Sequence, residues 1–335
     1  MDNTCKIRTR PCHSCLMCNS EGEIIYTDLE DKIFGAPGTW SFRKCSNPAC
    51  SLVWLDPMPL EEDIGYAYRN YFTHDAAESK IKNATSGLRY KFTLGLTSKL
   101  LRILLIKFTG LQKDVDKIES MYLSSDCPGK LLEIGCGSGD YLDKMHQMGW
   151  SVEGVDFDPV AVAHAREKYG FTVYAGKLEE LDLPSNSYDA ITMRHVIEHV
   201  YNLDELLRHC LRLLKQGGTL AIRTPNANSL GHQMFREFWR GLEPPRHIHL
   251  FSLHNLTTCL EKQGFRVVRA ETTAAGADFV FKQSMELREY GKHSLPSETR
   301  VKTLVASRFF QLYEYVVNSR KFDVGEELVL VCTKE

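Results

Sequence analysis

Residues 131–139 read Leu131-Leu132-Glu133-Ile134-Gly135-Cys136-Gly137-Ser138-Gly139. The apolar first half predicts a short buried strand, and the glycines predict a sharp turn over which a ligand can approach the main chain. A dinucleotide-binding loop would carry its third glycine one position further on, where this chain has Asp140. That carboxylate would repel a pyrophosphate, whereas it is compatible with a ligand that carries a sulfonium and an ammonium group.

Short apolar segments alternate with amphipathic segments from Cys127 to the end of the chain. This alternation predicts an α/β fold, with a doubly wound, mostly parallel sheet of seven strands covered by crossover helices. Asp156 ends the second strand, where an acidic side chain can accept both hydroxyls of a ribose. We expect strands at residues 130–134, 151–155, 172–174, 188–193, 219–223, 265–271 and 327–332, and helices at residues 139–148, 159–169, 203–214 and 253–262.

The glycine loop, the segment Gly154-Val155-Asp156-Phe157-Asp158-Pro159 and the segment Arg194-His195-Val196-Ile197-Glu198-His199-Val200 occur in a fixed order. Together they resemble the cofactor signature of class I S-adenosylmethionine-dependent methyltransferases, over about residues 127–270 and 327–332. The resemblance implies a Rossmann-like methyltransferase fold and S-adenosylmethionine as the cofactor. The motifs are specific for this superfamily and say little about the acceptor of the methyl group.

The same resemblance assigns the cofactor contacts residue by residue. It implies that Gly135, Gly137 and Gly139 line the methionine half, that Asp156 holds the ribose and that Phe157 lies against the adenine. It also implies contacts from Glu133, Cys136, Lys177, Leu178 and Arg194. Many relatives have an aspartate where this chain has Lys177.

Cysteines cluster near the N-terminus, where Cys15 and Cys18 form one close pair and Cys45 and Cys50 another. Four thiolates in two pairs suit a tetrahedral structural zinc, with Cys12 as a substitute ligand and reduced thiols as the alternative. The segments at residues 42–45 and 52–59 resemble the amino-terminal zinc ribbon of bacterial sugar and polysaccharide methyltransferases. A closed four-sulfur site has no open position, so a metal here would be structural rather than catalytic.

Two groups of polar residues are candidates for the chemistry. His195, Glu198 and His199 follow the fourth strand, at the sheet edge where ligands bind in such folds. If this turn is helical, the two histidines share one helix face. Residues 239–251 include Arg246, His247 and His249, which resemble a segment of the sugar-type relatives: the arginine could bind a phosphate or carboxylate, and either histidine could be a general base.

Composition and charge limit the remaining possibilities. The chain has 335 residues, 43% of them hydrophobic, and a formal net charge of -2, which excludes a nucleic-acid binder that works by bulk charge. Residues 79–113 contain no acidic residue and many basic and apolar ones. They predict either a packed helix or a peripheral contact with an anionic membrane. The polar start of the chain and the clustered cysteines indicate a cytoplasmic protein. Peripheral contact with the membrane is the second interpretation.

We therefore expect three segments: a cysteine-rich module at residues 1–58, a basic helical connection at 59–126, and a methyltransferase domain at 127–335 with a helical insertion at about 276–320. The expected function is O-methylation of a sugar, glycan or small polar metabolite, with a histidine as general base. The alternatives are a lipid or quinone-precursor methyltransferase at the membrane surface, and a non-catalytic, zinc-dependent binding module. A nicotinamide oxidoreductase fits Asp140 less well, and the sequence predicts no oligomeric state.

Overall fold

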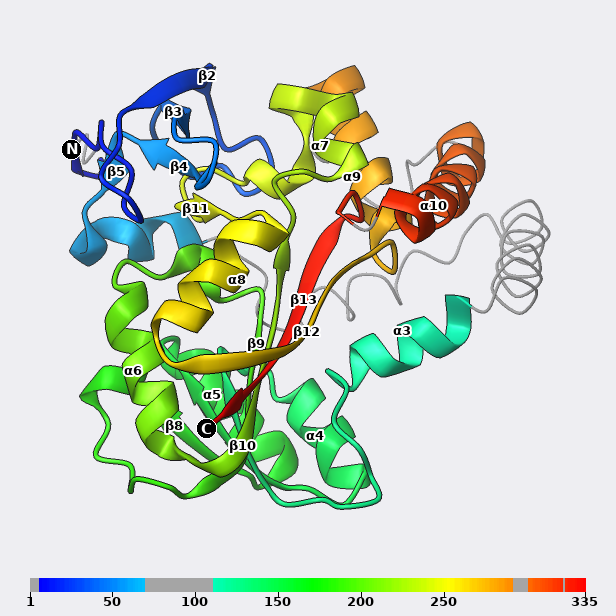
Figure 1. The fold of residues 1–335 in the computed structure, drawn as a ribbon. Coiled ribbons are helices and arrows are strands. Elements are labelled where there is room, and N and C mark those ends of the chain that lie inside the picture. The colour runs from blue at the N-terminus through cyan, green and yellow to red at the C-terminus, as the bar shows by residue number, and fades with distance from the viewer. Residues whose placement is uncertain (1–5, 70–110, 292–300, 322) are drawn as a thin grey trace. The chain divides into compact units, whose positions relative to one another are not determined.

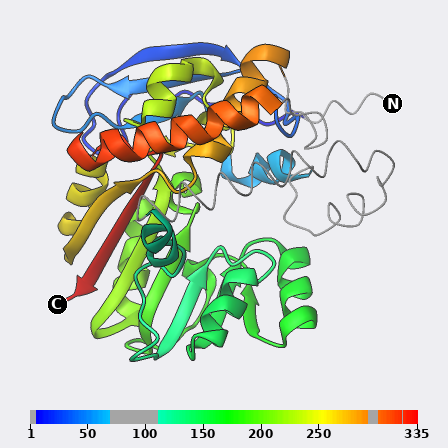
Figure 2. The ribbon, with the colours of Figure 1, turned by 90° about the vertical axis from the view of Figure 1, so that its right-hand side faces the viewer.

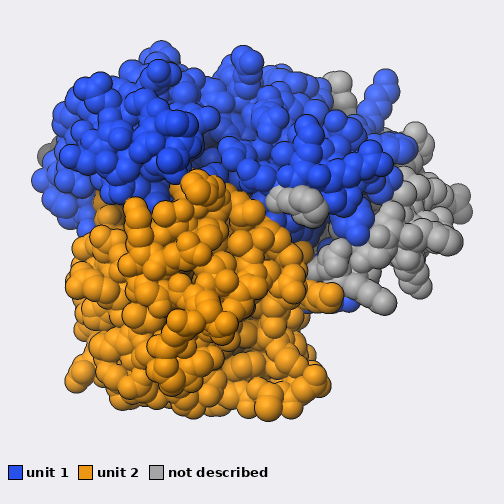
Figure 3. Space-filling model, viewed as in Figure 1, with its two compact units in different colours: residues 1–116, 225–252, 272–327 blue, residues 117–224, 253–271, 328–335 orange. Residues whose placement is uncertain are grey.

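The structure is a computed structural model that describes residues 6–69, 111–291, 301–321 and 323–335. It forms two compact units, each built from separate parts of the chain (Figure 3). Unit 1 comprises residues 1–116, 225–252 and 272–327, and unit 2 comprises residues 117–224, 253–271 and 328–335. The predicted division into segments 1–58, 59–126 and 127–335 stays a prediction.

A seven-stranded sheet organises unit 2, with the order β12-β13-β10-β9-β6-β7-β8 (Figure 1). The pairs β10–β9, β9–β6, β6–β7 and β7–β8 are all parallel, so the prediction of a Rossmann-like, mostly parallel sheet is confirmed. The strands are β6 (Lys130–Ile134), β7 (Ser151–Asp156), β8 (Thr172–Ala175), β9 (Tyr188–Arg194), β10 (Leu214–Pro225), β12 (Phe265–Thr273) and β13 (Glu327–Lys334).

The order of the strands reverses between β6 and β9. From β6 the chain continues to β7 on one side, while β9 and β10 lie on the other side. In such sheets, ligands bind beyond the carboxyl ends of the strands at this switch point. The glycine loop follows β6 directly, so the fold puts it at that position.

The helices of unit 2 begin and end where capping residues allow. They are α4 (Asp140–Gln147), α5 (Pro159–Tyr169), α6 (Leu203–Leu213) and α8 (Leu253–Lys262), and α3 (Leu111–Glu119) leads into the unit. The Asp158 side chain accepts a hydrogen bond from the N–H of Val160 at the start of α5, and Gly170 ends that helix in the left-handed region. The predicted boundaries of α5 are confirmed.

One predicted boundary is wrong. The sequence predicts a helix at residues 203–214 and a strand that starts at residue 219, with Gly217 and Gly218 as a break between them. Instead β10 already begins at Leu214, and its register with β9 shifts between Leu214 and Thr219. The two glycines form an irregularity inside the strand, because a residue with φ of 73° at Gly217 is compatible with a bulge.

The core of unit 2 lies between the sheet and its helices. Residues of β6, α4 and β9 are fully buried, among them Leu131, Leu142, Met145 and Ala190. Each buried leucine or methionine contributes about 1.5–3 kcal/mol relative to an exposed position. This packing holds the strand ends that carry the glycine loop.

Unit 1 contains a four-stranded sheet with the order β11-β4-β3-β2. Its strands are β2 (Gly22–Leu29), β3 (Trp40–Cys45), β4 (Val53–Asp56) and β11 (His249–Leu250), and β1 (Thr9–Arg10) pairs separately with β5 (Met58–Pro59). His249 pairs with Trp54, so a segment distant in sequence completes the sheet of the cysteine-bearing region. The 3-10 helix η1 (Glu61–Tyr68) follows β5.

Helices of unit 1 include α7 (Leu230–Phe235), α9 (Ala277–Tyr290) and α10 (Val301–Lys321), with the short 3-10 turns η4 (Arg236–Phe238) and η5 (Arg240–Leu242) between α7 and β11. The helices α9 and α10 lie in the stretch where the sequence predicts an insertion, and they pack against each other. The predicted basic segment at residues 79–113 lies almost wholly outside the described residues. Within the described part of the chain, no helix is both long and apolar enough to cross a membrane.

Candidate functional site

The glycine loop after β6 has the backbone that its sequence predicts. Gly135, Gly137 and Gly139 have φ values of 70°, 52° and 84°, which favour glycine. A Cβ atom on Gly135 would lie 2.4 Å from Cγ2 of Val196, whereas a Cβ atom on Gly137 would meet nothing within 4 Å. The loop therefore leaves open space above its middle glycine, where a ligand can approach the main chain.

Asp156 ends β7 and is bonded to the same loop. One carboxylate oxygen accepts a hydrogen bond of 2.8 Å from the N–H of Gly137, and the other accepts one of 2.9 Å from the N–H of Asp158. Each carboxylate oxygen can accept a second hydrogen bond, which is what a ribose diol supplies. These two hydrogen bonds fix the orientation of the carboxylate, and the ribose contact stays a prediction.

The residues implied at the adenine flank the ends of β7 and β8. Phe157 directly follows Asp156 and is 53% exposed, so its ring is available to a flat ligand. The N–H of Gly176 donates to the main-chain oxygen of Asp156 at 3.0 Å, which keeps the next residue, Lys177, beside this strand end. The Leu178 side chain is buried.

Glu133 lies in β6, two residues before the loop, and is fully buried. Nε of Arg194 is 3.1 Å from Oε1 of Glu133, and the Arg194 guanidinium lies over the ring of Tyr141 at 4.0 Å. Oε2 of Glu133 has no hydrogen-bond partner among the described residues. Burial raises the pKa of Glu133 to about 7, and the charge of Arg194 opposes that rise.

These features fit S-adenosylmethionine. A buried carboxylate oxygen without a partner can accept a hydrogen bond from an ammonium group, open space lies over Gly137, and Asp156 is oriented for a ribose. Cys136 is the exception among the implied contacts, since its thiol is buried and lies against Gly154. Only its backbone could contact the cofactor.

A second cluster follows β9 and β10. In the sheet, Ile134 pairs with Met193 and Arg194 pairs with Arg223, so three adjacent strand ends deliver Gly135, His195 and Thr224 to one edge. His195 has a left-handed φ of 55°, and its N–H donates to the oxygen of Arg223 at 2.8 Å. The tertiary structure holds this strained backbone, which is common at functional sites.

The His195 side chain is backed by a buried acid. Nδ1 of His195 lies 3.4 Å from Oε1 of Glu198, which is fully buried, while the imidazole is 46% exposed. The hydroxyl of Thr224 donates to Oε2 of Glu198 at 2.8 Å. A proton on Nδ1 directed at Glu198 would leave Nε2 as an acceptor, the form that a general base requires.

His199 does not share a helix face with His195. The helical turn is the 3-10 helix η3 (Ile197–His199), and His195 precedes it in a left-handed conformation. No local pattern selects Thr224 or Tyr141, although Thr224 begins a Thr-Pro-Asn segment at the end of β10. Both are apparent only from their contacts with Glu198 and Arg194.

In unit 1, Arg246 has a structural role that contradicts the expected grip on an acceptor anion. It is fully buried, and its guanidinium donates to Glu243 and Asp31, each at 2.8 Å, and to the main-chain oxygen of Ala67 at 2.9 Å. Burial opposes its charge, but the two carboxylates raise the pKa of Arg246 above its ordinary value. Through these bonds Arg246 connects three parts of unit 1: η1 through Ala67, the β2–β3 connection through Asp31, and the turn at residues 243–246 through Glu243.

His247 and His249 are also buried in unit 1. Nδ1 of His247 is 2.7 Å from the main-chain oxygen of Gly241, and its Nε2 is 3.8 Å from Glu243. His249 lies in β11, with its ring 5.9 Å from that of Phe251. His195 combines an exposed imidazole with a buried acidic partner, whereas His247 and His249 are buried.

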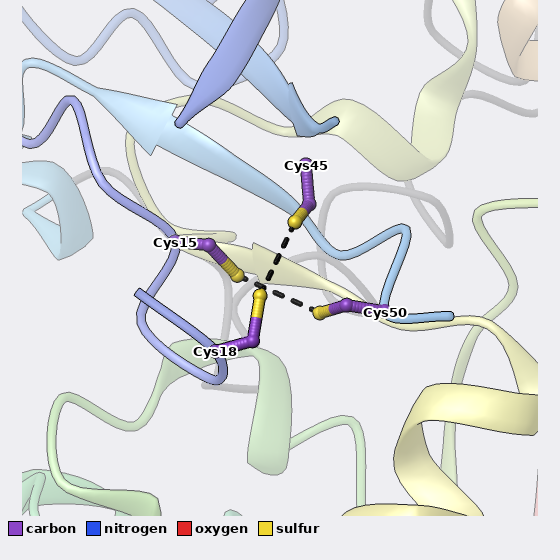
Figure 4. Close-up of side chains that lie close together, drawn as sticks. All are labelled: Cys15, Cys18, Cys45 and Cys50. Carbon is purple, nitrogen blue, oxygen red and sulfur yellow. Dashed lines mark hydrogen bonds between the residues drawn. The ribbon is translucent and has the colours of Figure 1, made fainter. Parts of the chain in front are cut away.

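The four cysteines predicted as metal ligands lie together. Their sulfur atoms are all within 4.8 Å of one another, with Cys15 Sγ 3.6 Å from Cys50 Sγ and Cys18 Sγ 3.4 Å from Cys45 Sγ (Figure 4). Zn–S bonds of about 2.3 Å in a tetrahedron put sulfur atoms about 3.8 Å apart, so the set fits zinc. Cys12 is not in this group, and its N–H instead donates to Asp56 at 2.8 Å.

Burial and local hydrogen bonds act in opposite directions on the ionisation of these cysteines. Burial raises the pKa of Cys15, and N–H groups of Met17 and Cys18 that bond its sulfur partly offset the rise. Burial likewise opposes ionisation of Cys18, but bonds from Ser20 and Cys45 lower the pKa of Cys18 to about 6. Thiolates are the form that binds a metal. The site is therefore compatible with a structural zinc.

Comparison with known proteins agrees with the geometry of unit 2. Residues 108–270 match the profile of the family described as "Methyltransferase domain". A "Probable S-adenosylmethionine-dependent methyltransferase" of Mycolicibacterium smegmatis is 33% identical over 150 residues, which are 43% of this chain and 55% of that protein. A mitochondrial ubiquinone biosynthesis O-methyltransferase of Rattus norvegicus is 33% identical over 129 residues, 34% of each chain.

Among solved structures, a SAM-dependent methyltransferase from Archaeoglobus fulgidus is similar, with a TM-score of 0.42 and 22% identity over 72% of this chain and 94% of that one. The chain thus spans between about a third and about half of the two curated relatives named above. The residues that match carry the glycine loop, Asp156 and the His195 cluster. Residues 108–270 of this chain thus match a family of methyltransferase domains.

Proposed function

We propose that this chain, whose residues 108–270 form a methyltransferase domain, is an O-methyltransferase that acts on a sugar, glycan or small polar metabolite. The observation that carries the proposal is the pairing of the exposed His195 imidazole with the buried Glu198 carboxylate. That pair follows β9, at the sheet edge where the glycine loop follows β6. A hydroxyl acceptor needs a base at such a position, whereas a pre-formed carbanion or a thiolate does not.

The residues of unit 2 would hold S-adenosylmethionine in a defined way. The backbone of Gly135 to Gly139 would contact its methionine part, Oε2 of Glu133 would accept from its ammonium, Asp156 would bind the ribose hydroxyls and Phe157 would cover the adenine. When bound, this cofactor supplies a methyl group on a positively charged sulfur. The protein has to align the acceptor with that group and to remove the proton of the acceptor.

His195 would take that proton. Nε2 would accept the proton of the acceptor hydroxyl and so leave its oxygen free to take the methyl group, with S-adenosylhomocysteine as the second product. Glu198 keeps the imidazole in the tautomer that has its proton on Nδ1 and stabilises the imidazolium that forms. Thr224 orients Glu198 through its hydroxyl. The proton then leaves His195 to solvent, since the ring is 46% exposed.

We also propose that Cys15, Cys18, Cys45 and Cys50 bind one structural zinc. Four sulfur ligands leave no position for substrate, so the metal would stabilise the fold of unit 1 without entering the reaction. This feature supports the resemblance to sugar-type methyltransferases that carry a zinc ribbon. Because Arg246 is buried and paired with carboxylates, we do not assign it to the binding of an anionic acceptor.

A lipid or quinone precursor is the second candidate acceptor. A relative named as a ubiquinone biosynthesis O-methyltransferase supports it, because that name places O-methylation in ubiquinone biosynthesis on a related domain. The same His195 and Glu198 would serve a phenol. A non-catalytic binding module is disfavoured, because it would have no use for a strained, exposed histidine backed by a buried acid.

Transfer of radiolabelled methyl from S-adenosylmethionine into fractionated extract tests the proposal. We expect label in the water-soluble or glycan fraction, reduced at least about a hundredfold by His195→Ala. His254→Ala, which removes an exposed histidine of α8, is the matched control for histidine loss elsewhere. Label in the lipid fraction would replace the sugar-type acceptor by the second candidate, and no transfer by wild-type protein to any fraction would refute an O-methyltransferase.

A further inference from the structure

One face of the helix α10 buries several polar residues, and another face exposes apolar residues to solvent. Its inward face carries the buried side chains Thr303, Ser307, Gln311 and Glu314. Its outward face carries Val305, Phe309, Tyr313 and Val316, which are 39%, 59%, 56% and 43% exposed. A surface helix of a globular protein normally shows the reverse arrangement.

Specific hydrogen bonds fix this orientation. Nε2 of Gln311 donates to the main-chain oxygens of Ala274 and Ala275 at 3.1 and 2.8 Å. The N–H of Glu326 donates to Glu314 at 2.7 Å, and Nδ2 of Asn318 donates to the oxygen of Thr272 at 2.7 Å. Turning the helix to bury its apolar residues would break these bonds and leave buried polar groups without partners.

The exposed residues form one continuous stripe. At about 100° per residue, six positions fall within an arc of about 80° and extend about 27 Å along the helix. In order they are Lys302, Val305, Phe309, Tyr313, Val316 and Arg320. Figure 2 shows α10 as a long helix that crosses the face of its unit turned toward the viewer. We call these six residues the α10 stripe.

The exposed charged residues of α10 are all basic. Lys302 and Arg320 close the two ends of the stripe, and Lys321 is also exposed. The helix has a single acidic residue, Glu314, and that residue is buried. Arg308 is paired with Asp278 of α9, so the cations at the stripe's ends are the ones available to a partner. The surface therefore combines aromatic and aliphatic groups with positive charge.

We propose that the α10 stripe is a docking surface for an anionic phospholipid bilayer. Helices that lie in a membrane interface combine an apolar face that bears aromatic residues with basic residues beside it. Anionic headgroups would meet Lys302 and Arg320, while Phe309 and Tyr313 enter the boundary of the acyl chains. The inference rests on neither the zinc nor the proposed methyl transfer, because it concerns different residues.

A second copy of this chain fits the stripe less well. If two stripes paired antiparallel about a two-fold axis, Lys302 of one chain would lie near Arg320 of the other at both ends. In a parallel pair, Lys302 would lie beside Lys302 of the other chain and Arg320 beside Arg320. Like charges so placed repel each other. Residues 79–113 contain no acidic residue, so this basic segment would not supply the missing negative charge either.

A peptide ligand also fits less well, because an amphipathic peptide needs a groove. Unit 1 has a cavity of about 160 Å³ lined by residues 27–33, 237–239, 242–244 and 287, and none of these belongs to α10. A convex stripe suits a deformable lipid surface better.

Vesicle flotation of the full chain tests the proposal, with phosphatidylcholine vesicles and with vesicles of equimolar phosphatidylcholine and phosphatidylglycerol. We expect binding to the anionic vesicles alone, at least about tenfold weaker for Phe309→Gln/Tyr313→Gln. Lys302→Gln/Arg320→Gln should weaken binding and reduce its dependence on salt. The matched control Ile24→Gln/Val268→Gln changes two side chains that are 51% and 50% exposed elsewhere, and it should bind as wild type does.

Circular dichroism and thermal denaturation verify that every variant is folded. If the wild-type chain does not bind the vesicles, the proposal is overturned. It is also overturned if the stripe variants bind as the wild type does while removal of charges within residues 79–113 abolishes binding. Light scattering supplies a further outcome. A stable dimer that Phe309→Gln/Tyr313→Gln converts to a monomer would assign the stripe to a second copy and refute lipid docking.

Discussion

Replacement of Glu198 by glutamine removes a negative charge from behind the proposed base. The side chain keeps its size, and Thr224 can still donate to the amide oxygen. The 3.4 Å separation between Nδ1 of His195 and Oε1 of Glu198 corresponds to an attraction of at most about 5 kcal/mol for an imidazolium at an effective dielectric constant of about 20. Solvent screens the half-exposed ring, so we expect a loss of about 1–3 kcal/mol, equivalent to about five- to 150-fold in kcat.

Initial-rate kinetics with the acceptor identified by methyl labelling measure this loss. The KM for S-adenosylmethionine should stay unchanged, because Glu198 is not among the residues that would hold the cofactor. The double variant His195→Ala/Glu198→Gln should be no slower than His195→Ala, since the acid acts through the imidazole. A Glu198→Gln enzyme with wild-type kcat, or losses that multiply in the double variant, would refute the assignment of Glu198 as a positioning residue.

Three further predictions concern the cofactor loop, the metal and the buried acid of β6. In Gly135→Ala, the new Cβ atom would lie 2.4 Å from Cγ2 of Val196. The variant should bind S-adenosylhomocysteine at least about tenfold more weakly in calorimetry and should have a lower melting temperature. Wild-type affinity would contradict the packing of the loop. Metal analysis should find one zinc per chain. The zinc should be lost, together with thermal stability, in Cys45→Ser and retained in Cys12→Ser. A wild-type chain that contains no metal and is as stable as the Cys45→Ser variant would exclude the site. Burial raises the pKa of Glu133 to about 7, so the folded chain binds its proton more tightly than the unfolded chain. Stability without cofactor should therefore fall as pH rises from about 4.5 to about 7, by at most about 3 kcal/mol. In urea denaturation, Glu133→Gln should be less sensitive to this pH change than the wild type, and an identical pH profile would contradict the raised pKa.

The strands and the cofactor loop of unit 2 could be predicted from sequence because their signals are local. Residues 131–139 contain both an apolar strand and glycines whose φ values of 52° to 84° the structure confirms. Asp158, Pro159 and Gly170 likewise mark the limits of α5. Each of these signals depends on a few neighbouring residues and on the conformations that they permit.

The remaining features depend on contacts between distant residues. Whether Arg246 is exposed cannot be read from its neighbours, since its partner Asp31 is 215 residues away. The sheet of the cysteine-bearing region is completed by β11, whose pairing with β4 no local pattern indicates. For Gly217, a helix end and a strand bulge need the same left-handed backbone, so the sequence alone could not separate them.

His195 shows the same limit at the candidate site. The sequence selects it together with His199, His247 and His249, and spacing favours none of them. A left-handed backbone, partial exposure and a buried acid at 3.4 Å distinguish it, and each of these follows from how β9 and β10 end side by side.

Isothermal titration calorimetry of the full chain with S-adenosylhomocysteine tests most directly whether unit 2 is a methyltransferase domain with the site described. We expect saturable binding of one ligand per chain, at least about tenfold weaker for Asp156→Ala and unchanged for His195→Ala. Absence of binding by the folded wild-type chain, or equal affinity of the Asp156→Ala variant, would contradict the account.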